Sequence, residues 1–139
     1  MKNRFVIVAL GVIACMTAFA VDYTWTGGAG DGKWTTPGNW GVASGYPSTD
    51  ADYVMFNGDA EVTLDTGTIT ELSHMKISAG EVTLNATDGS VLSFRKNATT
   101  DASGIIVADG AKFNLNAPVK QEKKRLDKWG QGTLEISGS

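Results

Sequence analysis

Short runs of alternating apolar and polar residues, each broken by glycine, asparagine or aspartate, constrain this chain most. Successive side chains of a β-strand point to opposite faces, so alternation over four to six residues predicts a short strand with one buried and one solvated face. No stretch from Asp59 onward has the period of about 3.6 residues that marks a helix. The sequence therefore predicts an all-β domain, with strands at residues 61–65, 74–78, 81–85, 91–94, 104–108, 112–116 and 133–137.

The spacing of these runs predicts how the strands are stacked. The tetrapeptide EVTL at residues 61–64 recurs unchanged at residues 81–84, and the apolar pair of residues 113 and 115 is echoed 21 positions later at residues 134 and 136. Repeats of about twenty residues are typical of solenoids, in which one turn of chain cannot bury its apolar face alone and stacks on its neighbours. We expect a parallel β-helix.

In such a β-helix, equivalent side chains of successive turns lie one above another. The repeat of EVTL predicts that Val62 stacks on Val82 and Leu64 on Leu84. A β-sandwich is the alternative, because Asp-Gly at residues 88–89 and at residues 109–110 can form the tight turns of antiparallel hairpins.

The first twenty residues resemble an export signal. Lys2 and Arg4 precede an apolar run at residues 5–16, and Ala18 and Ala20 supply the small residues of a cleavage site. Residues 1–20 are therefore predicted to be a signal peptide, and we expect a secreted or cell-surface protein. The apolar run is shorter than the roughly 20 residues of a membrane-spanning helix, so no transmembrane domain is expected.

A second interpretation of the leader concerns its cysteine. The sequence VIAC at residues 12–15 resembles a bacterial lipobox, in which Cys15 would be lipidated and become the new N-terminus. Cleavage after Ala20 instead removes Cys15, the one cysteine of the chain, and leaves no disulfide and no thiolate metal site.

Charge and composition narrow the function classes. Without Lys2 and Arg4, ten basic side chains face fifteen acidic ones, a net charge of −5, which disfavours a nucleic-acid partner. His74 is the single histidine, so a histidine metal cluster is not available within this chain, and a Ser-His-Asp triad would depend entirely on that residue. We expect no cofactor and no metal.

The last segment resembles a known repeat. KWGQGTLEISGS, residues 128–139, is similar to the autotransporter-associated β-strand repeat, Lys-x-Gly-x-Gly-Thr-Leu-x-Leu-Ser-Gly, with Ile136 in the second Leu position. The N-terminal stretch from Trp25 to Gly58 is similar to the opening of the same large secreted bacterial proteins. The matching repeat residues are Lys128, Gly130, Gly132, Thr133, Leu134, Ser137 and Gly138.

This resemblance implies a right-handed parallel β-helix passenger that is exported and surface-associated or released. It also implies a truncated copy, because members of the family are much longer than this chain of 139 residues. The family has no shared catalytic residues to transfer. Residues 129–134, WGQGTL, also resemble the last strand of antibody variable domains, but the Cys…Trp…Cys framework of that fold is missing.

Aromatic residues are concentrated in the Gly-rich segment that precedes the predicted strands. Two interpretations are open: the rings of Trp25, Trp34 and Trp40 cap the open end of the solenoid, whose apolar interior and strand edges need covering, or they form a platform that stacks on sugar rings. We divide the chain accordingly into residues 1–20, a cap at residues 21–58 and β-helix turns at residues 59–139.

Three polar stretches have simpler interpretations. GGAGDG, residues 27–32, is expected to be a turn, because its aspartate is one position early for a calcium-binding nonapeptide. Asp50, Asp52, Asp59 and Glu61 form a loose acidic group, which we interpret as solvated turn residues rather than a cation site.

The third is KQEKKRLDK, residues 120–128, whose clustered bases are interpreted as a solvated loop rather than a site for anionic glycans or phosphates.

The function that the sequence predicts is an exported structural or adhesive surface module without catalytic activity. The alternative is a carbohydrate-binding or carbohydrate-cleaving β-helix that uses Trp25, Trp34 and Trp40. A surface glycan is a possible partner, and self-association is expected through an open strand edge at the C-terminal end.

Overall fold

The computed structural model describes residues 20–95, 104–120 and 126–138. Within these ranges a single short 3₁₀ helix, η1 (Pro37–Trp40), accompanies twelve β-strands. Every pairing between these strands is parallel. The predicted all-β class is confirmed, and its sheets are parallel.

The strands form three sheets, whose strand orders are as follows. The five-stranded sheet contains β1 (Asp22–Thr24), β2 (Tyr53–Phe56), β5 (His74–Ile77), β8 (Gly104–Val107) and β11 (Asp127–Trp129). The four-stranded sheet contains β12 (Thr133–Ile136), β9 (Lys112–Leu115), β6 (Glu81–Ala86) and β3 (Ala60–Leu64). The three-stranded sheet contains β10 (Val119–Lys120), β7 (Val91–Phe94) and β4 (Ile69–Leu72).

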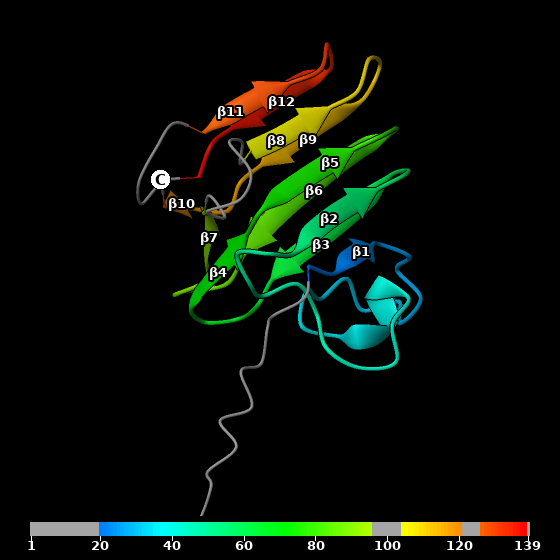
Figure 1. Ribbon diagram of the computed structural model, residues 1–139, viewed down its shortest axis with the longest axis vertical. Coiled ribbons are helices and arrows are strands. Elements are labelled where there is room, and N and C mark those ends of the chain that lie inside the picture. The colour runs from blue at the N-terminus through cyan, green and yellow to red at the C-terminus, as the bar shows by residue number, and fades with distance from the viewer. Residues whose placement is uncertain (1–19, 96–103, 121–125, 139) are drawn as a thin grey trace, which may run out of the picture.

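From β2 onward the chain visits the sheets in a fixed cyclic order. β2, β3 and β4 enter the five-, four- and three-stranded sheets in turn, and β5 to β7, then β8 to β10, repeat that order before β11 and β12. In Figure 1 the strands of the two larger sheets follow one another from β2 and β3 to β11 and β12, and the N-terminal segment with β1 and η1 lies beyond β2 and β3. Each strand therefore pairs with the equivalent strand of the next passage.

The Asp-Gly turns do not form hairpins. Asp88 and Gly89 lie between β6 and β7, and Asp109 and Gly110 lie between β8 and β9, so each turn connects strands of different sheets. These turns are corners in the path of the chain. The antiparallel pairing that the β-sandwich alternative needs is therefore not formed at either of them.

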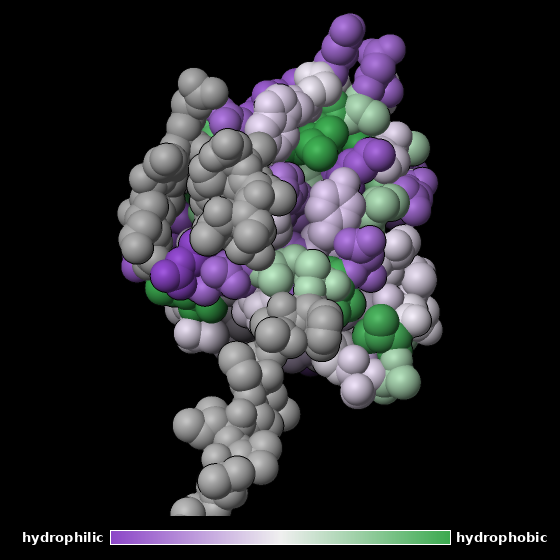
Figure 2. All heavy atoms as spheres, in the orientation of Figure 1, coloured by the Kyte–Doolittle hydropathy of each residue, from purple (hydrophilic) through white to green (hydrophobic). Residues whose placement is uncertain are grey.

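The core consists of the inward positions of successive strands. In the four-stranded sheet Val62 pairs with Leu84 and Leu84 with Leu115, and all three side chains are fully buried. The intervening residues point outward, as the alternating burial of each strand shows. On the face shown in Figure 2, hydrophobic residues lie in small groups among hydrophilic and intermediate ones.

The register between β3 and β6 corrects one prediction. Val62 pairs with Leu84 rather than with Val82, and Leu64 pairs with Ala86 rather than with Leu84. This shift of two residues keeps the same side chains inward. The turn sets this register: the Asp59 carboxylate accepts the N–H of Glu81 at 2.8 Å, and Gly80 packs against Gly58 and Asp59. Two residues lie between Gly58 and the EVTL at residues 61–64, whereas Gly80 directly precedes the EVTL at residues 81–84. Alignment of the two glycines therefore offsets the two EVTL segments by two residues.

The second predicted echo is confirmed. Leu134 pairs with Phe113 and Ile136 with Leu115. Glycines in the turn between β11 and β12 allow this close stacking. A Cβ on Gly130 would lie 2.1 Å from the Val107 carbonyl oxygen, and a Cβ on Gly132 would lie 2.2 Å from the Ala108 carbonyl oxygen.

Several strands were not predicted from the alternating pattern. β2 lies inside the segment expected to be a cap, so the sheets begin before residue 59. The ends of the basic stretch at residues 120–128 lie in β10 and β11, and residues 121–125 lie outside the described residues. The unpredicted strands are β1, β2, β4, β10 and β11.

The leader lies almost wholly outside the described residues. Residues 1–19, which include Lys2, Arg4, Ala18 and Cys15, are not described, so the signal peptide and the lipobox stay predictions. In the part of the chain that is described, no helix has the length and apolar character needed to cross a membrane.

Gly80→Ala is expected to destabilise the fold by at least about 2 kcal/mol, because Gly80 has a φ of +75° and a Cβ there would lie 2.6 Å from the Asp59 backbone nitrogen. Urea unfolding measures this loss. Gly110→Ala has the same φ but open space, and should cost only about 1 kcal/mol. Gly58→Ala meets nothing within 4 Å and serves as the matched control. Equal losses at Gly58 and Gly80 would contradict the proposed role of the stacked turn.

Candidate functional site

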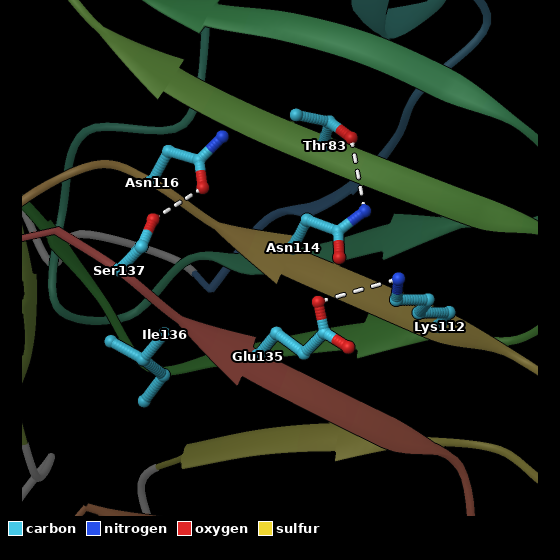
Figure 3. Close-up of a pocket in the computed structure, with 7 residues that line it drawn as sticks. All are labelled: Thr83, Lys112, Asn114, Asn116, Glu135, Ile136 and Ser137. Carbon is cyan, nitrogen blue, oxygen red and sulfur yellow. Dashed lines mark hydrogen bonds and ion pairs between the residues drawn. The ribbon is translucent and has the colours of Figure 1, made fainter.

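A shallow polar groove of about 550 Å³ lies on the outer face of the four-stranded sheet. It is built from outward residues of β6, β9 and β12, from the exposed Ile136 of β12, and from residues that directly follow β9 and β12. Figure 3 shows these side chains projecting from neighbouring strands of the sheet. The groove is lined by Thr83, Lys112, Asn114, Asn116, Glu135, Ile136 and Ser137.

One end of the groove carries a charged cluster. The Lys112 ammonium lies 3.5 Å from a Glu81 carboxylate oxygen and 3.3 Å from a Glu135 carboxylate oxygen. The hydrogen bond with Glu135 raises the pKa of Lys112, and the charges of Glu135 and Glu81 act in the same direction. The two glutamate side chains are exposed and Lys112 is half-buried, so the cluster orients its members more than it stabilises the fold.

The rest of the groove is lined by amides and hydroxyls of two neighbouring outward columns. Asn114 donates to Glu81 Oε1 at 2.7 Å and to Thr83 Oγ1 at 3.3 Å. Asn116 donates to Asn85 Oδ1 at 2.9 Å, and its own Oδ1 accepts the Ser137 hydroxyl at 2.6 Å. In-register parallel pairing brings these side chains together from strands far apart in the sequence.

This arrangement suits binding by hydrogen bonds. Asparagine side chains both donate and accept, and the carboxylates of Glu81 and Glu135 accept. Such groups match ligands rich in hydroxyls, or the side chains of another polypeptide. The groove could not be predicted from the sequence, because its members are common strand residues that only the register brings together.

A row of rings on the outer face of the five-stranded sheet was also not predicted. The Tyr53 and His74 ring centroids lie 5.8 Å apart, and those of His74 and Trp129 lie 6.1 Å apart and nearly parallel. Burial and the charge of Asp22 raise the pKa of Tyr53. His74 Nδ1 also lies 2.7 Å from the hydroxyl of Ser73, a residue that is itself buried. Because the His74 ring is stacked and its partner serine is buried, the pair does not present an open nucleophile and base.

The structure buries two of the three tryptophans considered for glycan stacking. Trp34 is 0% and Trp40 1% exposed. The indole N–H of Trp34 donates to the Pro47 carbonyl at 2.8 Å, and the indole N–H of Trp40 donates to the Trp34 carbonyl at 2.6 Å. Trp25 is half-buried, and its ring centroid lies 4.8 Å from that of Trp40. Trp34 and Trp40 therefore present no ring face to a sugar, and among these three residues only Trp25 reaches the surface.

The tryptophan-rich segment that precedes β2, called the aromatic segment below, covers the N-terminal edges of two sheets. β1 pairs with β2, and the stretch around Lys33 bridges to Thr63 of β3, where the Trp34 N–H donates to the Thr63 carbonyl at 2.9 Å. The Trp40 ring lies between those of Trp34 and Phe56, with centroid distances of 4.7 Å and 6.0 Å. The segment therefore covers the apolar side chains at the N-terminal end of the sheets.

The glycine-rich turn is held by Asp31 and Asn39. Asp31 accepts the Lys33 backbone N–H at 3.0 Å, the Thr36 hydroxyl at 2.7 Å and the Asn39 amide at 2.6 Å. These hydrogen bonds, that from Lys33 first, lower the pKa of the Asp31 carboxyl. Asn39 is fully buried, and its Oδ1 accepts the Ala29 N–H at 3.0 Å. The aspartate of this motif thus holds backbone and side-chain donors of its own segment.

The loose acidic group is divided by the fold. Asp52 is buried and accepts the backbone N–H groups of Ser48 and Thr49, both at 2.9 Å. Asp59 and Glu61 lie instead beside Glu81 in a second shallow groove. Within the described ranges, no group of three or more His, Cys, Asp and Glu side chains is arranged to hold a metal ion.

Comparison with known protein families, with curated proteins and with solved structures finds no match for this chain.

Trp40→Ala is expected to lower the free energy of unfolding by about 3–5 kcal/mol, because it empties a buried site between Trp34, Trp25 and Phe56. Trp25→Ala, at a half-buried position, should cost clearly less. Urea unfolding followed by tryptophan fluorescence and circular dichroism measures both losses. A Trp40→Ala protein of unchanged stability would contradict the role of this ring in the core.

Stability should depend on the ionisation of Asp31. Because its pKa is lowered in the folded chain, its contribution is present above the ordinary carboxyl pKa and is lost as the pH falls through the lowered value. Between about pH 4 and pH 2 the wild type should therefore lose more stability than Asp31→Asn. Asp109→Asn, at an exposed turn, is the control and should follow the wild type. Identical acid profiles for Asp31→Asn and wild type would refute the prediction.

Proposed function

We propose that this chain is an exported structural or adhesive surface module without catalytic activity, built as a right-handed parallel β-helix with an aromatic cap at its N-terminal end. The observation that carries the proposal is the cyclic passage through three parallel sheets, in register from strand to strand. Stacked passages of this kind form a rigid rod whose outward side chains vary without disturbing the core.

The covered N-terminal end supports the same proposal. The edges of β2 and β3 are paired with residues of the aromatic segment, as expected for the cap of a solenoid, which protects unpaired strand edges from aggregation. The resemblance of residues 128–139 to the autotransporter-associated repeat agrees with an exported passenger. The predicted signal peptide at residues 1–20 supplies the route of export.

A second candidate function is glycan binding through the polar groove. The amides of Asn114 and Asn116 and the hydroxyl of Ser137 lie close together on an open face, where a hydroxyl-rich chain can exchange hydrogen bonds with them. This site differs from the tryptophan platform considered from the sequence, because it contains no aromatic ring.

Adhesion by intact cells tests the proposal. A bacterial host that expresses the full chain should display it at the surface, detected by protease accessibility, and should adhere to immobilised glycoprotein more than cells expressing a chain without residues 1–20. No reducing sugar should be released from polysaccharides. Adhesion lost in Asn114→Ala with Asn116→Ala, but kept in Trp25→Ala, would identify the groove as the glycan site. Absence of both display and adhesion, or release of sugar, would refute the module without catalytic activity.

A further inference from the structure

We propose that Asn57 is a site of spontaneous covalent modification, at which ring closure with Gly58 releases ammonia and converts the asparagine into aspartate and isoaspartate. The two residues are the one Asn-Gly pair of the chain, and they lie in the turn between β2 and β3. The isoaspartate product lengthens the main chain of the turn that aligns β3 with β6. This inference goes beyond the proposed function and does not depend on it.

The surroundings of Asn57 leave both reacting groups accessible. Asn57 is exposed, and its side chain makes no hydrogen bond with a described residue. The Gly58 N–H likewise donates to no acceptor in the part of the chain that the structure describes. A Cβ on Gly58 would meet nothing within 4 Å, so the space beside this glycine is open.

The reaction needs no partner besides water. The Gly58 nitrogen attacks Cγ of Asn57, the Cγ–Nδ2 bond breaks, and the side-chain nitrogen leaves as ammonia with the amide proton of Gly58. Glycine favours this step because it has no Cβ beside the attacking nitrogen and its backbone is the least restricted. Water then opens the cyclic imide: cleavage at Cγ gives aspartate, whereas cleavage at the main-chain carbonyl carbon gives isoaspartate.

The fold holds another exposed asparagine in place, and that residue serves as an internal comparison. Asn116 is exposed, but its side chain donates to Asn85 at 2.9 Å and accepts the Ser137 hydroxyl at 2.6 Å. The next N–H, that of Ala117, donates to the Leu84 carbonyl at 3.0 Å. Both reacting groups are therefore occupied at Asn116, whereas both are open at Asn57.

The isoaspartate product is expected to weaken the stacking of the first two turns. The modified pair lies between two hydrogen bonds to the next turn: the Phe56 carbonyl accepts the Ser78 N–H, and the Asp59 carboxylate accepts the Glu81 N–H, both at 2.8 Å. Isoaspartate inserts one further main-chain bond of about 1.5 Å between these anchors, which displaces at least one of them. The aspartate product adds a charge at an exposed position and leaves the main chain unchanged.

Peptide mapping by mass spectrometry tests the modification. The full chain is incubated at neutral pH for increasing times in water enriched in heavy oxygen. The peptide that contains Asn57 should lose its side-chain amide, gain one heavy oxygen atom and become a substrate for an isoaspartyl methyltransferase. Asn116 should keep its amide over the same period.

Two variants separate ring closure from simple exposure of the amide. Gly58→Ala should slow the loss of ammonia severalfold, because a Cβ hinders the attack, and it should stay folded because that Cβ meets nothing and Gly58 has no left-handed φ. Asn57→Gln should keep its amide, because the longer side chain would have to close a larger ring.

Urea unfolding tests the effect on the turn. The isoaspartate form, isolated by ion exchange, should unfold at a lower urea concentration than the fresh wild type. Asn57→Asp, which has the charge without the additional main-chain bond, is the matched control and should unfold close to the wild type.

Three results would overturn the modification site: an amide that Asn57 keeps while the urea-unfolded chain loses it, equal loss at Asn57 and Asn116, or an unchanged rate in Gly58→Ala. An isoaspartate form as stable as Asn57→Asp would overturn the effect on the turn.

Discussion

Parallel pairing in register is the constraint on which the rest of this structure depends. It stacks Val62, Leu84 and Leu115 into one buried column. The same pairing assembles the outward column of Asn85, Asn116 and Ser137 into a polar surface. Core and surface are thus two sides of a single alignment, and a slip of one residue would exchange them. The turns fix that alignment because stacked glycines leave no room for a different spacing.

Each end of the stack raises a different physical problem. At the N-terminal end, three indole rings and Phe56 cover the apolar interior, while short backbone pairings occupy the strand edges. At the C-terminal end of the described chain, the edge carries Lys128 in an inward column and Glu135 in an outward one. Burial of aromatic rings therefore closes the N-terminal end.

The alternating runs were sufficient to predict seven strands and the all-β class, because a strand with one wet face has a visible period of two. Short strands such as β1, β10 and β11 have no such period, and each exists because a neighbouring edge offers hydrogen bonds. β4 is similar: Ile69, an outward residue, is 40% exposed whereas Thr70 is buried, which reverses the usual pattern. The groove was equally invisible, since Lys112 and Glu81 are 31 residues apart in the sequence and meet only through the register.

The sequence by itself determined the period of the chain, the positions of its turns and the concentration of aromatic residues before the main strands. These features are local, since they follow from side-chain alternation and from glycine conformation. Tertiary structure decided the register, the burial of Trp34 and Trp40 and the meeting of Asp31 with Asn39. These depend on which segments stack, and the repeated EVTL is misleading because the turn glycine, rather than the repeated side chains, sets the alignment.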